Sequence, residues 1–145
     1  MTRTGRVLAL AALAAAGAQL VPVARTNPPA VADIGAPAEI ASVLRRACYD
    51  CHSNETQWPW YSHIAPVSWL LAHDVEEGRQ KLNFSAWRRF GPERQARKRA
   101  QSIREVRKGK MPPWSYRALH PEARLTRTER NALMAWLESS TTVRP

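Results

Sequence analysis

The fold of this chain must accommodate two cysteines, Cys48 and Cys51, which are followed directly by His52. They are the only cysteines among 145 residues, so a disulfide-dense scaffold and a Cys₄ zinc site within one chain are excluded. In a Cys-x-x-Cys-His sequence, the two thiols can bond to the vinyl groups of one porphyrin, and the histidine is placed beneath its iron. The pattern therefore predicts one covalent haem c, attached through Cys48 and Cys51, with His52 as the proximal metal ligand.

Three other uses of the cysteine pair are open at this level. A redox Cys-x-x-Cys pair is expected near a βαβ pattern, whereas the flanks here are Pro-rich and helical in pattern. A zinc site would need both cysteines and two of the four histidines, and the common His-x₃₋₅-His spacing is missing. The third alternative is an incidental disulfide or a pair of buried thiols. The leader at the N-terminus favours haem, because bacteria attach haem c outside the cytoplasm.

The N-terminus has the form of a secretory signal. Arg3 and Arg6 precede an apolar run over residues 7–18 that ends in Ala-Gly-Ala, a typical cleavage pattern. Even extended to Ala24 this run is short and Ala-rich, whereas a membrane-spanning helix needs about 20 apolar residues. We predict that residues 1–24 are a signal peptide or a retained N-terminal anchor. The protein is then periplasmic or otherwise exported, either free or held at the inner membrane by its N-terminus.

The rest of the chain predicts a linker followed by one all-α domain. Residues 25–36 are Pro-rich and without apolar periodicity, which indicates an extended linker. Residues 37–145 show helical periodicity and no alternating strand pattern longer than a few residues, so we expect helices joined by long loops. The expected helices cover 37–48, 66–77, 92–108 and a segment that starts after Thr126.

Apolar spacing and boundary residues define these helices. The first and last have clear apolar faces, and Thr126-x-x-Glu129 forms a capping box before the last one. Gly78 is expected to end the second helix, and the third has only a thin apolar stripe. The expected buried residues are Ile40, Val43, Leu44, Ala47 and Cys48 in the first helix, Val67, Leu70, Leu71 and Val75 in the second, Ala96, Ala100, Ile103 and Val106 in the third, and Leu133, Trp136 and Leu137 in the fourth.

The second axial ligand of the iron is predicted to be Met111. This residue lies in Gly-Lys-Met-Pro-Pro-Trp, where the prolines stiffen the loop and lower the entropy cost of holding a ligand. Met134 falls inside the last helix and is expected to fill the core. The alternatives are His63, His73 or His120 as the ligand, and a Met111 that only packs on the core.

Charge and aromatic residues indicate further contacts. The formal net charge is +10, and residues 88–110 hold ten basic and two acidic side chains. This basic stretch is either a solvated helix face, a docking patch for an acidic redox partner or a contact for anionic lipid. Nucleic acid is not expected as a partner, because export removes the protein from it. Trp60 and Tyr61 are candidates to line the haem pocket, with ordinary core packing as the alternative.

Four stretches of the chain resemble the bacterial haem-binding domain family related to class I cytochrome c. They are CYDCHSNETQWPWYSHIAPVSW (48–69), LNFSAW (82–87), GKMPPWSY (109–116) and HPEARLT (120–126). The resemblance implies a cytochrome c-like helical domain over 37–145, built around one covalent haem, and an exported location. In cytochromes c a proline carbonyl after the haem motif commonly accepts the N–H of the proximal histidine. Pro66 is the matching residue here.

Together these observations predict an exported mono-haem c-type cytochrome domain. Its expected role is single-electron transfer through an iron ligated by His52 and Met111, and it is not expected to be an enzyme. The alternative is a haem-based redox or gas sensor, or another small-ligand-binding module, in which Met111 is displaced or absent from the iron. The sequence shows no distal acid–base constellation that would support a peroxidase.

Overall fold

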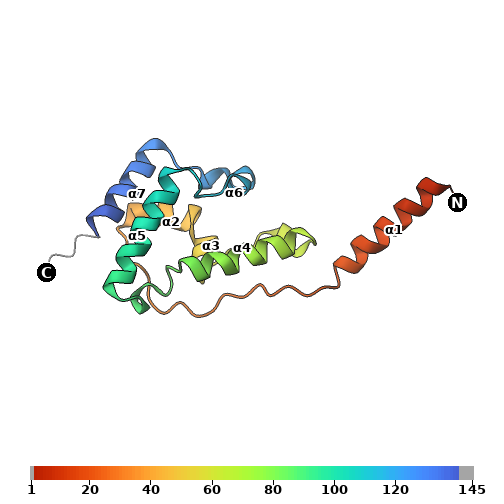
Figure 1. Ribbon diagram of the computed structural model, residues 1–145, viewed down its shortest axis with the longest axis horizontal. Helices are drawn as coiled ribbons and strands as arrows, with labels where there is room; N and C mark the ends of the chain where they lie inside the picture. The colour runs from red at the N-terminus through yellow and green to blue at the C-terminus, as the bar shows by residue number, and fades with distance from the viewer. Residues whose placement is uncertain (1, 141–145) are drawn as a thin grey trace.

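In the computed structural model, which describes residues 2–140, all the regular elements of this part of the chain are helices (Figure 1). One isolated parallel β-bridge joins Ala32 and Ala86. The prediction of an all-α fold is therefore confirmed. The α-helices are α1 (Arg3–Ala18), α2 (Ala38–Ala47), α3 (Tyr49–His52), α4 (Val67–Lys81), α5 (Pro92–Arg107), α6 (Trp114–Leu119) and α7 (Arg127–Ser139). Short 3-10 turns form η1 (Trp60–His63), η2 (Trp87–Arg89) and η3 (Pro121–Ala123).

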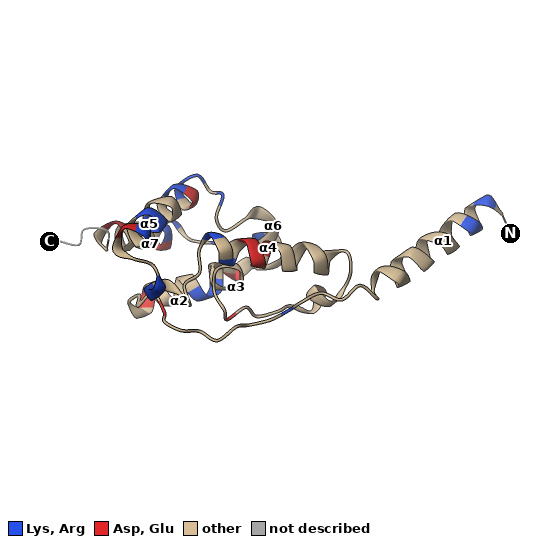
Figure 2. Ribbon diagram, turned by 60° about the horizontal axis from the view of Figure 1, so that its bottom comes forward, with Lys and Arg blue, Asp and Glu red and all other residues tan. Residues whose placement is uncertain are grey.

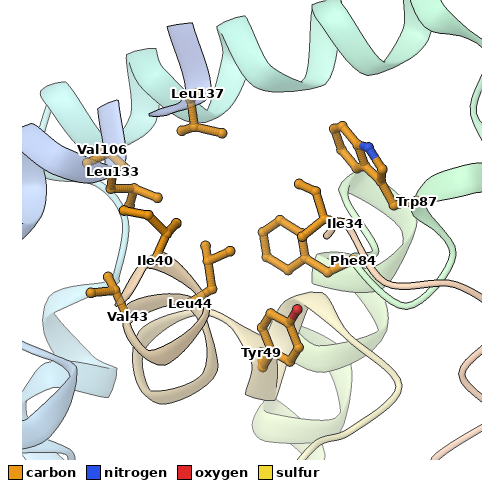
Figure 3. Close-up of a cluster of buried hydrophobic side chains, with 10 residues drawn as sticks. All are labelled: Ile34, Ile40, Val43, Leu44, Tyr49, Phe84, Trp87, Val106, Leu133 and Leu137. Carbon is orange, nitrogen blue, oxygen red and sulfur yellow. The ribbon is translucent and has the colours of Figure 1, made fainter. Parts of the chain in front are cut away.

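The core lies where α2, α5 and α7 pack together (Figure 3). Most of the apolar stripe predicted for the first helix is buried on α2, and Leu133 and Leu137 are buried on α7. Each such Leu or Val side chain contributes about 1.5–3 kcal/mol when it is fully removed from water. Trp87, Phe84 and Tyr49 extend the same cluster towards the Cys-x-x-Cys-His turn.

The predicted capping box at the start of α7 is confirmed. The Thr126 hydroxyl accepts a hydrogen bond from the Glu129 amide at 3.2 Å, and the Glu129 carboxylate accepts one from the Thr126 amide at 2.8 Å. The same carboxylate pairs with Arg46 of α2. The cap therefore fixes both the first turn of α7 and its contact with α2.

Replacing Thr126 with alanine is expected to lower the free energy of unfolding by about 1 kcal/mol, because the Glu129 amide loses its acceptor and the Glu129 carboxylate loses the hydroxyl that donates to it. For a domain of this size that corresponds to a fall of roughly 4 °C in Tm. Thr128→Ala, an exposed position in the same turn, is the control and should change Tm far less. Equal effects of the two substitutions in thermal unfolding would contradict a capping role.

Helix α1 and the segment that follows it lie along and beyond the body of the protein (Figure 1). No residue of α1 is buried, and the side chain of Gln19 makes two hydrogen bonds to the backbone of Ala65. None of the helices described here combines the length and the hydropathy that a membrane span requires. Residues 25–36 run extended across the surface and reach the body through the bridge at Ala32.

Two helices differ from their predictions in ways that matter for the site. Helix α4 does not end at Gly78 but continues to Lys81, and of its predicted apolar face only Val75 is buried. On α5 the predicted stripe is incomplete, because Ala100 is exposed and Arg99 is buried instead. The Arg99 guanidinium lies between the rings of Trp87 and Trp136, at 4.9 and 5.1 Å from their centroids. Cation–π contacts of this kind allow an arginine to take a core position.

Candidate functional site

The Cys-x-x-Cys-His segment forms the corner between α2 and α3. Cys48 ends α2, and Cys51 and His52 lie in the single turn of α3. Both cysteines are free thiols that are partly exposed, so the disulfide considered from the sequence is not formed. Burial raises the pKa of both thiols to about 12, which keeps them protonated at neutral pH.

The backbone of α4 sets the protonation of the His52 ring. Its Nδ1 lies 3.0 Å from the carbonyl oxygen of Gly78 and 3.1 Å from that of Leu82. A carbonyl can only accept, so Nδ1 must hold the proton and Nε2 keeps a free lone pair. Burial also lowers the pKa of His52, which favours the neutral ring. This is the form in which a histidine ligates a metal, with its outer nitrogen fixed by a backbone partner.

The carbonyl partners of His52 differ from the prediction of Pro66. Pro66 precedes α4, and its carbonyl accepts hydrogen bonds from the amides of Trp69 and Leu70 at 3.1 and 3.4 Å. That carbonyl is therefore used to start the helix. The opposite end of α4 passes His52, where the Gly78 carbonyl accepts from the Leu82 amide at 2.8 Å and its second lone pair is available to the imidazole N–H. The proximal histidine is thus held by the end of this helix and not by its beginning.

Gly78 allows α4 to pass so close to the motif. A Cβ atom at this position would lie 2.3 Å from the carbonyl oxygen of Cys51 and 3.0 Å from its carbonyl carbon. Atoms do not approach so closely, so any side chain would force the helix and the motif apart. The prediction that this glycine ends the helix is wrong, because a glycine inside a helix can also mark a close contact between backbones.

Two cavities adjoin the motif, and together they form what we call the cleft. Each is lined by Cys48, His52, Lys81 and Met111, so the cavities meet at these four side chains. The first, of about 300 Å³, lies against the core residues Leu44, Phe84, Val106, Leu133 and Leu137. The second, of about 370 Å³, also includes Cys51, the outer face of α4 and the residues 112, 113, 115 and 116.

The apolar face of α4 belongs to this cleft. Val67 and Leu70 are 42% and 62% exposed, and both line the second cavity together with Leu71. Apart from the buried Val75, the face predicted to enter the protein core therefore lines this cavity and is not covered by the core. A flat apolar group in the cleft would cover these side chains, and the free Nε2 of His52 would meet its metal. The residues present consequently fit a haem.

Charged residues line both cavities of the cleft. Lys98, Gln101 and Ser102 of α5 line the first cavity, and Lys81 lines both. These side chains offer donors to the acidic groups of a porphyrin. The second cavity instead holds three acidic residues, Asp50, Asp74 and Glu77, and burial raises the pKa of Asp74. The first cavity thus holds the Lys98 cation and the acidic Glu105 of α5, and in the second the Glu77 carboxylate pairs with Lys81 at 2.7 Å.

Met111 lies in the bend between α5 and α6, where the structure brings it into the same cleft as His52. It is partly buried against the core and lines both cavities. The competing histidines do not line either cavity. His63 and His73 are exposed, and the His120 ring is bonded to Tyr61 and Glu122. Of the ligand candidates from the sequence, Met111 is the one with access to the cleft.

Trp60 and Tyr61 do not line the cleft, in contrast to the prediction. The η1 turn directs Trp60 outward, where it is 75% exposed. The Tyr61 hydroxyl lies 2.6 Å from Nε2 of His120, whose Nδ1 is 2.9 Å from the Glu122 carboxylate. The aromatic residues of the cleft are Phe84 and Tyr116.

Tyr116 and Arg79 connect the motif to the rest of the protein, and neither residue was predicted from the sequence to belong to the site. The Tyr116 hydroxyl donates to the Asp50 carboxylate at 2.6 Å, inside the Cys-x-x-Cys segment. Arg79, next to Gly78, donates to the carbonyl of Ser53 and to the linker carbonyl of Thr26, both at 2.8 Å. Its outer nitrogen also donates to Thr56 at 2.8 Å and Asn27 at 2.9 Å. Such long-range partners leave no periodic signal in the sequence.

An all-α body with a free imidazole nitrogen, two adjacent thiols and an apolar cleft defines a haem-binding protein. The comparison with known families agrees, because the model of the haem-binding domain family matches residues 13–139. The chain belongs to this family. The comparisons of this chain with curated proteins and with solved structures found no match. The relation to class I cytochromes c and the covalent attachment stay predictions.

Proposed function

We propose that the protein is a mono-haem c-type cytochrome domain that transfers single electrons. The observation that carries this proposal is that His52 and Met111 line one cleft, beside both cysteines of the motif. Haem bound there supplies an iron that gains or loses one electron. Imidazole and thioether ligation suits electron transfer, since neither axial position is left open for a substrate. A carrier is therefore favoured over an enzyme.

The residues of the chain have distinct roles in this proposal. Cys48 and Cys51 hold the haem c through thioether bonds, and the Gly78 and Leu82 carbonyls orient His52. Lys81 and Lys98 bind the acidic edge of the porphyrin. The core on one side and the apolar face of α4 on the other exclude water from the iron, which lets buried charges and ligands set its potential.

The proposed location rests on the N-terminal leader, and the proposed partner rests on the basic stretch 88–110. The signal-like leader supports export to the periplasm, with an uncleaved α1 holding the chain at the inner membrane. The basic stretch 88–110 supports docking of an acidic redox partner, because four arginines of α5 are exposed, although Arg97 and Arg107 are also paired with Glu93 and Glu138 (Figure 2). Charge complementarity of this kind speeds the encounter more than it strengthens the complex.

The test of this function compares two methionines in the haem-loaded protein. Met111→Leu is expected to remove the methionine–iron charge-transfer band from the ferric spectrum while covalent haem is retained, because the thioether is lost at nearly constant volume. Met134→Leu, which changes a methionine of α7 packed on the core, is the control and should keep the band. Ready binding of carbon monoxide by the unsubstituted protein would instead support the sensor alternative. Absence of covalent haem after expression with haem maturation would overturn both functions.

A further inference from the structure

One end of the body is built from a segment that has no formally charged residue. Between Glu55 and Asp74 the sequence has no Lys, Arg, Asp or Glu, and these residues form η1 and the first half of α4 (Figure 2). Trp60, Ile64 and Trp69 are 75%, 46% and 40% exposed here. None of the three lines the cleft, so bound haem would leave them uncovered. We call these three side chains the apolar tip.

The apolar N-terminal segment arrives at the same end. Gln19 donates to the carbonyl of Ala65 at 3.2 Å and accepts from its amide at 3.0 Å, directly beside Ile64. The residues between Arg6 and Arg25 are uncharged, and no residue of α1 is buried against the body. A cation lies at the margin of this end, because Arg25 donates to the Ser62 carbonyl at 3.1 Å. Two uncharged, apolar segments that are distant in sequence thus emerge side by side.

We propose that the apolar tip lies against the interfacial region of a phospholipid bilayer. Tryptophan is enriched where bilayers meet water, because its ring is apolar and its N–H is polar. A protein partner would also accept exposed tryptophans, but it would not explain why the unpacked apolar helix α1 joins the chain at this point. Arg25 at the margin suits the phosphate level of the lipid.

This orientation goes beyond electron transfer and does not depend on it. The basic residues of α5 lie at the end of the body remote from α1 (Figure 2). With the tip on the membrane, that basic end faces the aqueous phase, where a soluble acidic partner can reach it. The two surfaces would therefore act at opposite ends of one small domain.

The test measures amide hydrogen exchange of the haem-loaded full chain with and without vesicles of zwitterionic phosphatidylcholine, which has no net charge. We expect protection of peptides from residues 56–73 and vesicle binding that persists in high salt, because the tip has no charge to screen. Replacing Trp60 and Trp69 together with serine should remove this protection and weaken binding by about tenfold, since each ring buries roughly 150–250 Å². The protection is informative even where α1 alone still retains the chain on the vesicles.

The matched control replaces Trp114 and Leu119 of α6, which are 76% and 62% exposed, with serine. This variant should keep both the protection and the binding. Unchanged exchange of residues 56–73 upon addition of vesicles would overturn the proposal. It would also be overturned by binding that needs anionic lipid and disappears in salt, since that result assigns the contact to the basic stretch. The haem absorption spectrum of each variant checks that the fold is intact.

Discussion

Replacing Gly78 with alanine is expected to reduce haem loading more than any other substitution outside the ligands themselves. Alanine in a helix interior ordinarily gains about 1 kcal/mol over glycine. Here its methyl group would meet the Cys51 carbonyl at 2.3 Å, and a backbone atom cannot turn away as a side chain can. Helix α4 would have to move, which draws the Gly78 carbonyl away from His52. We expect a net loss of about 2 kcal/mol in the free energy of unfolding, as overpacking typically costs more than the propensity gain.

Urea unfolding and haem content per chain measure the two parts of this prediction. Gly91→Ala is the control, because a Cβ atom there has no neighbour within 4 Å and Gly91 lies outside the cleft. It should leave haem loading almost unchanged and lower stability by less than about 1 kcal/mol, because alanine is a weaker N-cap than glycine at the start of α5. A Gly78→Ala protein with normal haem content and stability would show that α4 does not pack on the motif as described.

Arg79→Met is expected to give the second large effect, this time mainly on stability. Methionine keeps the aliphatic part of the side chain but removes all donors to Ser53, Thr56 and the linker. Hydrogen bonds from a charged group contribute about 1.5–3 kcal/mol each when buried. The Arg79 side chain is partly exposed to solvent, so we expect a total loss of about 3 kcal/mol rather than the sum.

The control for Arg79 is Gln80→Met on the next position of the same helix. Gln80 is exposed and bonds only to Glu76 within α4, so its replacement should change stability by less than about 0.5 kcal/mol. Limited proteolysis adds a local measurement, since residues 25–36 should become accessible in Arg79→Met alone. Unaltered protection of this segment would contradict the role of Arg79 in holding the linker.

Local signals explain which parts of the fold could be predicted. The apolar spacing of α2 and the capping box of α7 depend on residues a few positions apart, and both are confirmed. The same signal failed for α4, because periodicity shows that a face is apolar but not what covers it. Its Val67 and Leu70 line the cleft, not the protein core. The burial of Arg99 was not predicted for a related reason, since it depends on contacts with two tryptophans that are distant in sequence.

The residues of the candidate site could be predicted from the sequence, but the residues that hold them in place could not. The motif and Met111 were found because their residue types and spacing serve one chemistry, and the structure brings them to one cleft. The partners of His52 come from the end of a helix that begins fifteen residues after it. Trp60 and Tyr61 were misplaced because aromatic residues near a motif do not show which way a short turn directs them.

The approach of α4 to His52 also has an electrical consequence. The peptide dipoles of a helix add up to a partial negative charge at its C-terminus, and this end of α4 meets the N–H of the imidazole ring. A partial negative charge at Nδ1 makes Nε2 a stronger electron donor to iron and stabilises the ferric state. In the proposed haem site, the Met111 thioether and the Lys81 and Lys98 cations would act in the opposite direction. The midpoint potential of the bound haem would therefore be a balance between a helix end on one side and a sulfur with two ammonium groups on the other.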